Sequence, residues 1–179
     1  MRSGMPTSQQ TALVEELFQV FCERDYPTCL AKVFDLGMTL RLRTFTPILT
    51  NGIGGRPDAP DLQIILIHTV ACLRVGDQSG AETAFMLNLV DHRPGKDRLM
   101  ALPALSLRRS SFPDVLKHAP SDQARLQAHY WEAEGRLTDR MYAEAFDSFR
   151  SCTPARLSIP EEVFAEARLS WLAFGDLPS

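Results

Sequence analysis

The stretch Tyr142-Ala143-Glu144-Ala145-Phe146-Asp147-Ser148-Phe149 decides the fold class of this chain. Its apolar side chains fall three and four positions apart, which places them on one face of an α-helix. A second helical segment begins after Ser121 and runs through Leu137, and a turn near Arg140 joins the two. We therefore expect two antiparallel helices with a short connection, a helical hairpin.

The same hairpin pattern recurs along the rest of the chain. Residues 38–60 differ, because they mix Thr, Arg and apolar residues without a period and are dense in turn formers, so we expect an insertion or long loop there. No segment alternates with the period of a β-strand, and the chain is predicted to be all-α. Periodic apolar residues predict further helices over about 9–22, 28–36, 61–76, 80–90, 97–107, 114–118 and 161–174.

The turns between the paired helices are regularly spaced. Gly76, Ser110, Arg140 and Gly175 are separated by 34, 30 and 35 residues. An earlier turn at Arg24 lies 52 residues before Gly76, and the insertion accounts for the surplus. Helix-turn-helix units of about 34 residues are the signature of the tetratricopeptide class of helical repeats.

The residues around two of these turns resemble the tetratricopeptide repeat (TPR) family. The segment from Gly76 to Phe85 looks like the family's turn and second helix, and the opening stretch fits the same register. In such repeats a small residue sits where the two helices of a unit cross, and an aromatic or β-branched residue fills the groove to the next unit. The resemblance assigns this repeat-packing role to Cys29, Val33, Ala81, Phe85, Ala145 and Phe149.

The resemblance implies a right-handed α-solenoid of antiparallel helical hairpins, with about four and a half units in one domain over residues 1–179. The repeats are divergent, since no unit carries the family's complete set of first-helix residues. A generic array or bundle of helical hairpins is the alternative architecture.

In the last helix, Ser158 and Glu161 form a predicted capping box, and Gly175 ends the helix.

Composition excludes several classes of protein. The 179 residues are 45% hydrophobic, enough for one substantial core, and 19 basic against 22 acidic residues disfavour nucleic-acid binding. The first ten residues hold no signal-peptide core, and the longest apolar run, Leu62–Leu73, is interrupted by polar residues. We expect a soluble, cytoplasmic protein without membrane insertion. The four cysteines lie in apolar segments at irregular spacing, as is typical of reduced thiols in a core.

Metal and catalytic chemistry are not predicted. His68 and Cys72 lie four positions apart on one helix, but no second pair at ribbon or finger spacing accompanies them, so we expect no metal and no cofactor. The glycine-rich residues 51–56 lack the Lys-Ser/Thr of a phosphate-binding loop. We expect no enzyme, and the alternative is a helical enzyme or ligand-binding domain that uses His68, Cys72 and His129.

Candidate partner-binding residues come from the arginines and the large aromatics. The chain has 16 Arg against three Lys, and arginine can grip a carboxylate through two hydrogen bonds. The alternative for the arginines is a solvated surface. The alternative for the tryptophans is packing between successive repeat units. The segment from Arg108 to Phe112 resembles a substrate of basophilic kinases and makes Ser111 a candidate phosphosite. The partner-binding candidates are Arg74, Arg98, Arg125, Arg136, Arg168, Trp131 and Trp171.

The predicted function follows from the architecture. An array of hairpins leaves an extended surface for peptides or partner helices, so we expect a non-catalytic protein-protein interaction scaffold or adaptor. It would be a subunit of a larger complex, such as a trafficking or tethering assembly in vesicle transport. The last helix is apolar and lacks the second helix of its unit, which favours assembly with a partner. The alternative is a small chaperone or escort for a secretion-system component or another aggregation-prone partner.

Overall fold

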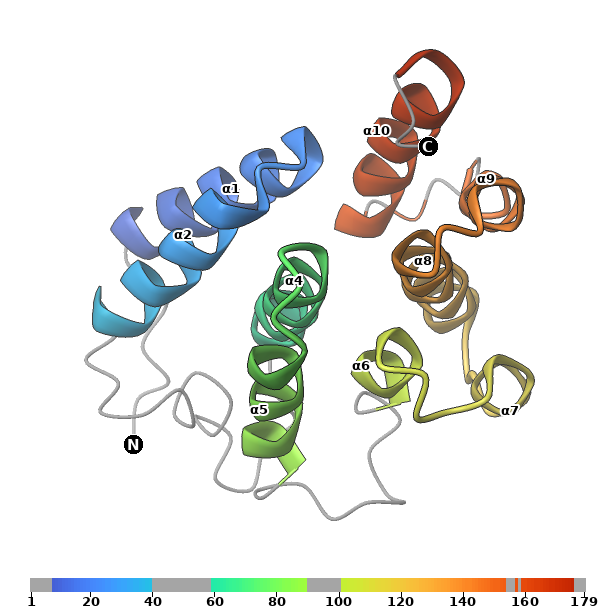
Figure 1. Cartoon of the computed structure of the whole chain (residues 1–179), viewed down its shortest axis with the longest axis horizontal. Coiled ribbons are helices and arrows are strands. Elements are labelled where there is room, and N and C mark those ends of the chain that lie inside the picture. Colours follow the sequence, from blue (N-terminus) through green and yellow to red (C-terminus); the bar gives the residue numbers. More distant parts are fainter. Residues whose placement is uncertain (1–7, 40–58, 90–100, 154–156, 158, 176–179) are drawn as a thin grey trace. The chain divides into compact units, whose positions relative to one another are not determined.

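The computed structural model describes residues 8–39, 59–89, 101–153, 157 and 159–175 (Figure 1). Every element within these residues is an α-helix, as the sequence predicts. The chain divides into two compact units, Met1–Asp91 and His92–Ser179. One domain over residues 1–179 stays a prediction, since the packing described below lies within each unit. Most of the predicted insertion around 38–60 lies outside the described residues.

In the first unit each helix packs against the helix that follows it. The unit contains α1 (Ser8–Glu23), α2 (Tyr26–Thr39), α4 (Ala59–Arg74) and α5 (Gln78–Leu89). α1 packs against α2, α2 against α4 and α4 against α5, and α1 also contacts α4. Three helices therefore cover α4, which explains why its sequence is apolar almost all round. The buried side chains of α4 include Ile64, Ile65, Leu66, Ile67, Val70 and Ala71.

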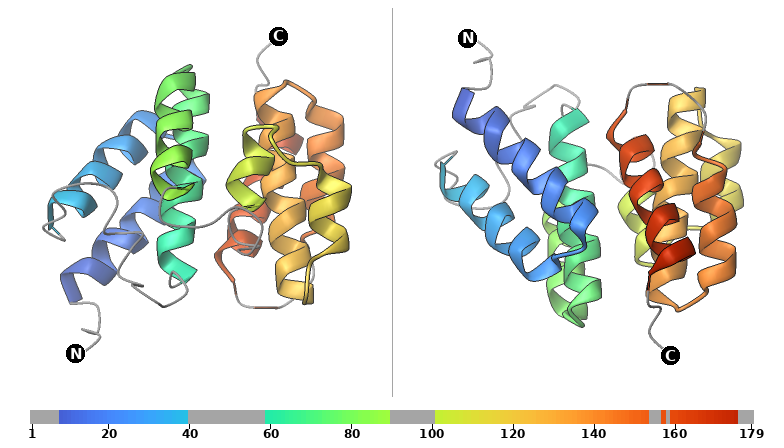
Figure 2. Two further views of the ribbon diagram at one scale, coloured as in Figure 1. Left: turned by 90° about the horizontal axis from the view of Figure 1, so that it is seen from below. Right: turned by 90° about the horizontal axis from the view of Figure 1, so that it is seen from above.

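The second unit is built around one central helix. It contains α6 (Ala101–Ser106), α7 (Phe112–Lys117), α8 (Asp122–Thr138), α9 (Tyr142–Arg150) and α10 (Pro160–Phe174). α8 contacts the other four helices, α6 also packs on α7, and α9 packs on α10. Figure 2 shows α8 and α9 side by side as an antiparallel hairpin. Because α8 is surrounded, its buried side chains include charged ones, Glu132 and Glu134.

Four turns that follow the first helix of a hairpin share one backbone geometry. Arg24, Gly76, Arg108 and Arg140 all have positive φ, between 58° and 81°. In each turn the residue that follows the positive-φ residue donates its backbone N–H to the carbonyl five positions before it. Asp25 donates to Val20 in this way, and Asp77 donates to Cys72. This pattern is the Schellman motif, which caps the C-terminal end of a helix.

The positive-φ residues correct the predicted register of one turn. Arg108, and not Ser110, is the left-handed residue of the third turn, and it lies 32 residues after Gly76 and 32 before Arg140. Arg109 and Ser110 then lengthen this turn, so that Ser111 becomes the N-cap of α7. Gly175 ends α10 in an extended conformation, with φ −87°, and therefore does not belong to this series.

The left-handed arginines predict a measurable gain from glycine. A non-glycine residue in this region costs about 1–2 kcal/mol, so we expect Arg140→Gly to raise the free energy of unfolding by about 0.5–1 kcal/mol. Arg125→Gly, at an exposed position inside α8, should lower it by about the same amount. Urea denaturation followed by circular dichroism measures the unfolding free energies of both variants. A loss of stability in Arg140→Gly would contradict the left-handed conformation assigned to Arg140.

The six residues to which the resemblance gives a repeat-packing role are all buried. Cys29, Val33, Ala81, Phe85, Ala145 and Phe149 are between 0 and 5% exposed. The small residues of the set, Cys29, Ala81 and Ala145, each lie four residues after the residue that precedes a second helix. The backbone N–H of each donates to the carbonyl of that preceding residue, as Cys29 does to Asp25 and Ala145 to Met141.

Among the described helices none is long and apolar enough to cross a membrane.

Candidate functional site

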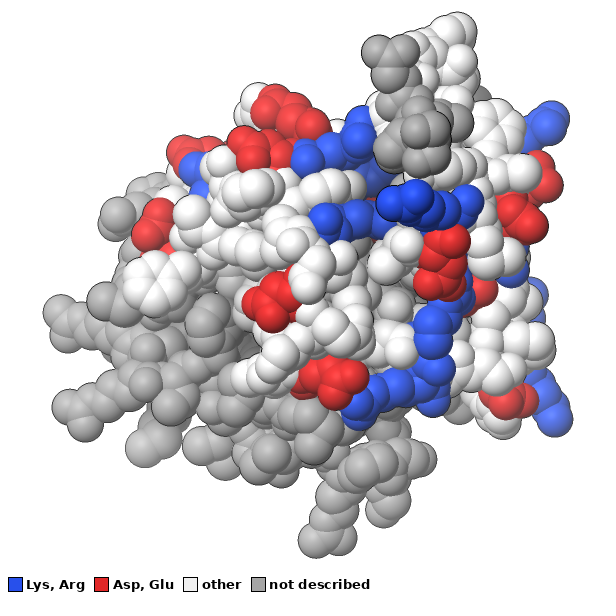
Figure 3. All heavy atoms as spheres, in the orientation of Figure 1, with Lys and Arg blue, Asp and Glu red and all other residues white. Residues whose placement is uncertain are grey.

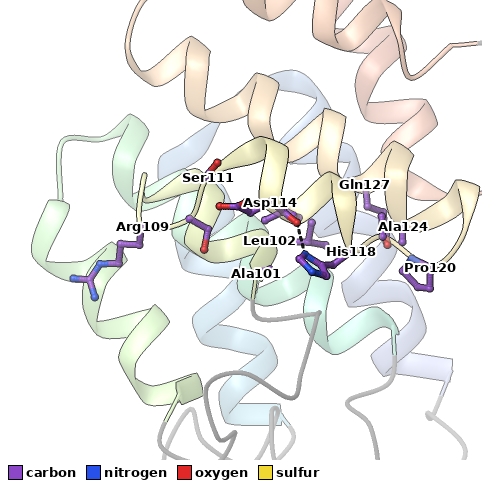
Figure 4. Close-up of a pocket in the computed structure, with 12 residues that line it drawn as sticks. Ala101, Leu102, Arg109, Ser111, Asp114, His118, Pro120, Ala124 and Gln127 are labelled. Carbon is purple, nitrogen blue, oxygen red and sulfur yellow. Dashed lines mark hydrogen bonds between the residues drawn. The ribbon is translucent and has the colours of Figure 1, made fainter.

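A pocket of about 460 Å³ opens in the second unit between α6, α7 and α8 (Figure 4). Half of the twelve residues that line it are polar and half are apolar, and three of the apolar ones are alanines. Polar residues of the lining are Arg109, Ser110, Ser111, Asp114, His118 and Gln127. The apolar residues are Ala101, Leu102, Val115, Ala119, Pro120 and Ala124. A volume of this size is typical of a site for one small organic group.

The position of Gln127 in this pocket is fixed from behind by a buried carboxylate. Gln127 is 7% exposed, and its Nε2 donates a hydrogen bond to Glu161 Oε1 over 3.1 Å. Trp131 Nε1 donates to the same oxygen over 3.3 Å. A carboxylate only accepts hydrogen bonds, so the amide of Gln127 is oriented with its Nε2 toward Glu161.

Glu161 therefore has a different role from the one predicted. The predicted N-cap Ser158 lies outside the described residues, and the N-cap of α10 is instead Ile159, which makes no side-chain capping hydrogen bond. Glu161 is fully buried instead, and it holds the side chains of Gln127 and Trp131 on α8.

His118 is the C-cap residue of α7, and its side chain turns back toward that helix. Its Nδ1 lies 2.8 Å from the backbone oxygen of Asp114. Since a carbonyl only accepts, Nδ1 carries the proton of this contact. Figure 4 shows the His118 ring among the lining residues, whereas the Arg109 side chain extends away from them.

A buried ion pair joins α8 to α10. Glu134 and Arg168 are both fully buried, and Arg168 Nε lies 2.7 Å from Glu134 Oε1. The Tyr130 hydroxyl donates to the same oxygen over 2.7 Å. The rings of Trp131, Phe149 and Phe164 surround Tyr130 at centroid distances of 4.8, 5.4 and 5.9 Å.

This core removes two residues from the set of partner-binding candidates. Arg168 and Trp131 are 0% exposed, so a partner cannot reach them in this structure. Trp131 lies in the core of the second unit, where its ring contacts that of Tyr130 and its Nε1 donates to Glu161. Trp171 is half-buried on α10, and its ring lies edge-on to Tyr142 at 6.5 Å.

The other candidate arginines are in different surroundings. Arg136 donates to Glu132 over 3.1 Å and to Ser148 over 3.2 Å, so acidic and polar groups of its own unit hold it. Arg74, in the first unit, lies over the Tyr26 ring at 6.0 Å. Arg125 is exposed, and Arg98 lies outside the described residues.

Acidic residues balance the basic ones on the surface. On the face shown in Figure 3, basic and acidic side chains lie beside one another. Arg108 is an example, since its guanidinium pairs with Asp139 over 2.6 Å and with Glu132 over 3.0 Å. The ion pairs of Arg108 and Arg136 with acidic groups of their own unit are of the kind that a solvated surface contains. Binding of an acidic peptide by the arginines stays a prediction.

Ser111 is exposed at the rim of the pocket. It is the N-cap of α7, yet its hydroxyl makes no capping hydrogen bond. The oxygen is therefore not engaged in holding the helix. Phosphorylation of Ser111 stays a prediction.

The residues of the metal and enzyme hypotheses lie in two different units. His68 and Cys72 are on α4, and His129 is on α8, where the Phe112 ring lies 5.0 Å away. Burial raises the pKa of the Cys72 thiol to about 11, with a smaller contribution from Asp77. Among the described residues no group of three or more His, Cys, Asp or Glu side chains could hold a metal ion.

Burial of His68 predicts a pH dependence of stability. Desolvation lowers the pKa of His68 below its ordinary value of 6.5, against a smaller opposing effect of Asp77. The unfolded chain then takes up more protons than the folded one as the pH falls below about 6.5, so stability declines toward acid. We expect the fall in unfolding free energy between about pH 7.5 and 5.5 to be smaller in His68→Leu. Urea denaturation at each pH measures it, and an unchanged slope would contradict the prediction.

None of the four cysteines forms a disulfide bond. Cys29, Cys72 and Cys152 are buried and Cys22 is half-buried. Burial, with a contribution from Glu161, raises the pKa of the Cys152 thiol to about 12. The thiols are therefore core residues, as their apolar sequence surroundings predict.

Sequence reasoning missed the polar pairs between α8 and α10. Glu134 and Arg168 are 34 residues apart, and so are Gln127 and Glu161. This separation equals the predicted repeat period, so pairing polar residues one period apart would have found both contacts.

A comparison with protein-family models, curated proteins and solved structures finds no match to this chain.

Proposed function

We propose that this chain is a TPR-like helical repeat protein, a right-handed α-solenoid that acts as a non-catalytic adaptor in a larger cytoplasmic complex, such as a trafficking or tethering assembly. The packing pattern within each unit carries the proposal. Within a unit each helix packs against the next one, and α1, α6 and α8 also pack against the next helix but one, as α8 does with α9 and α10. Arrays of this kind bury their core in successive seams and present extended surfaces to proteins.

Two further observations support the repeat. The same Schellman turn ends the first helix of four hairpins. Side chains that lie 34 residues apart meet across α8 and α10, as residues at equivalent positions of successive repeats do.

The outer side of α10 is the surface that we assign to a partner. Its inner side, with Phe164, Ala165 and Arg168, is buried. The outer stripe of α10 consists of Val163, Ala167, Trp171 and Phe174, which recur at helical spacing. Val163 is 60% exposed and Phe174 90% exposed.

Charge indicates what kind of partner fits the outer stripe. Glu162 and Glu166 lie beside the stripe, and Glu166 is exposed. A partner helix with an apolar face and flanking Lys or Arg side chains would match both features. This is the helix-in-groove mode of recognition.

A quantitative pull-down tests the adaptor proposal. The full chain is used as bait, and captured proteins are identified by mass spectrometry. We expect Val163→Asp/Phe174→Asp to lose a specific set of larger subunits that the wild-type bait retains. Phe34→Asp, at a residue that is 58% exposed on α2, is the matched control and should retain them.

Two results would contradict the proposal. One is a set of captured proteins that both variants retain equally. The other is a chain that is stable only together with one small client, which is the behaviour of an escort.

A further inference from the structure

We propose that Ser111 is the target of a basophilic Ser/Thr protein kinase, and that the ion pairs of Arg108 with α8 control the access of the kinase to this serine. The proposal concerns the turn between α6 and α7. It goes beyond the adaptor function and does not depend on it.

The spacing of the basic residues selects Ser111. Arg108 and Arg109 lie three and two positions before it, and Phe112 follows it. Basophilic kinases hold arginines at these two positions with carboxylates of their substrate groove. Ser111 is exposed and its hydroxyl makes no capping hydrogen bond, so its Oγ is open to a phosphoryl donor. Ser110 is half-buried and has the arginines one position too close.

The reaction transfers the γ-phosphoryl group of ATP. A bond forms between Ser111 Oγ and the γ-phosphorus, the bond from that phosphorus to the bridging oxygen breaks, and ADP leaves. The proton of the hydroxyl goes to the catalytic aspartate of the kinase.

The folded turn keeps Arg108 engaged with α8. Its Nε and Nη2 lie 2.8 and 2.6 Å from Asp139 Oδ2, and its Nη1 lies 3.0 Å from Glu132 Oε2. The guanidinium lies against the backbone of α8 at Gly135, where an added Cβ would be 3.2 Å from Cζ. A kinase that binds Arg108 must therefore replace these two carboxylates with its own. Arg109 already extends away from the pocket (Figure 4).

The backbone of the motif is also folded back on α6. Arg108 has a left-handed φ of 58°, and the N–H of Arg109 donates to the carbonyl of Ala104 over 2.7 Å. An enzyme groove that takes its peptide in extended form cannot bind this turn as it stands. Phosphorylation of Ser111 therefore requires that the turn open.

The helix that follows the turn can open at low cost. No residue of α7 is buried, and the structure describes all six of them. The ring of Phe112 lies edge-on to His129 at 5.0 Å and is only half-buried. Segments with few buried apolar contacts open locally without unfolding of the whole domain. The contacts of Arg108 with α8 oppose this local opening.

An assay with a kinase of known specificity tests the site. Full-length protein is incubated with Mg²⁺, ATP and the catalytic subunit of cyclic-AMP-dependent protein kinase, and tandem mass spectrometry locates the phosphate. We expect phosphate on Ser111, which Ser111→Ala abolishes and Ser110→Ala does not. No phosphate on Ser111 in either the wild type or Asp139→Asn would overturn the proposal. Faster modification by an acidophilic casein kinase, which reads Asp114, would also overturn it.

Initial rates test the role of Arg108. Asp139→Asn removes the charge of one of its two carboxylates and should raise the rate of Ser111 phosphorylation about threefold. Asp147→Asn removes a charge at an exposed position of α9, and it is the matched control that should leave the rate unchanged. Equal rates for Asp139→Asn and the wild type would overturn the control by Arg108.

A third variant separates local opening from global unfolding. Phe164→Leu weakens the core between α8 and α10 without touching the turn. Because the turn opens locally, the rate of Ser111 phosphorylation should stay at the wild-type value in this variant. A rise in Phe164→Leu equal to that in Asp139→Asn would assign the access of the kinase to global unfolding and overturn the control by Arg108.

Discussion

Glu134→Leu should lower the free energy of unfolding by about 3–5 kcal/mol. The substitution leaves the guanidinium of Arg168, which is 0% exposed, buried without the carboxylate 2.7 Å from its Nε. It also removes the acceptor of the Tyr130 hydroxyl. Urea denaturation followed by circular dichroism at 222 nm measures the change.

A series of variants separates the charge from the hydrogen bond. Glu134→Leu/Arg168→Met removes both charges and should recover most of the loss, because an apolar pair of similar volume replaces a buried ion pair at little cost. Adding Tyr130→Phe should recover the remainder, since it removes the hydroxyl left without an acceptor. Glu144→Leu, at an exposed position of α9, is the control and should change stability by less than about 0.5 kcal/mol. A double variant no more stable than Glu134→Leu would contradict the assigned ion pair.

Trp131→Ala should cost about 3–5 kcal/mol, a loss of the same size. Trp131 is fully buried and contacts the Tyr130 ring at a centroid distance of 4.8 Å, so truncation leaves a large cavity. It also removes a donor to the buried Glu161. Circular dichroism is again the suitable measurement, because tryptophan fluorescence changes with the substitution itself.

Trp171→Ala is the matched comparison and should cost only about 1 kcal/mol. Trp171 is half-buried on the outer stripe of α10, and one face meets Tyr142. We expect this variant to weaken partner capture while leaving the fold intact. Equal destabilisation by the two substitutions would mean that Trp171 also belongs to the core.

The helices were predictable from sequence because their signals are local. Glycine at a left-handed position, as at Gly76, and serine at an N-cap, as at Ser121, mark the ends of helices by their own chemistry. The left-handed arginines carry no such mark, since this conformation is uncommon outside glycine and asparagine. The sequence pattern therefore predicts the third turn at Ser110, whereas its left-handed residue is Arg108.

The candidate site was less predictable, because the side chains that form it are held by partners distant in sequence. Arg168 looks like an exposed cation until Glu134 is placed beside it, and Glu161 looks like a helix cap until Gln127 and Trp131 reach it. A single helix does not show which of its polar residues face a neighbour. The period of the repeat holds that information, since it relates α8 to α10.

The buried thiols provide a way to compare the two units. Cys72 lies in the first unit and Cys152 in the second, and each becomes accessible to an alkylating reagent only when its surroundings open. Labelling rates followed site by site, with the half-buried Cys22 as internal reference, therefore measure the opening of each unit separately. Equal rates at both sites mean one cooperative body, and unequal rates mean two folding units of different stability. The natural sequence thus already contains a reporter of local opening in each half of the chain.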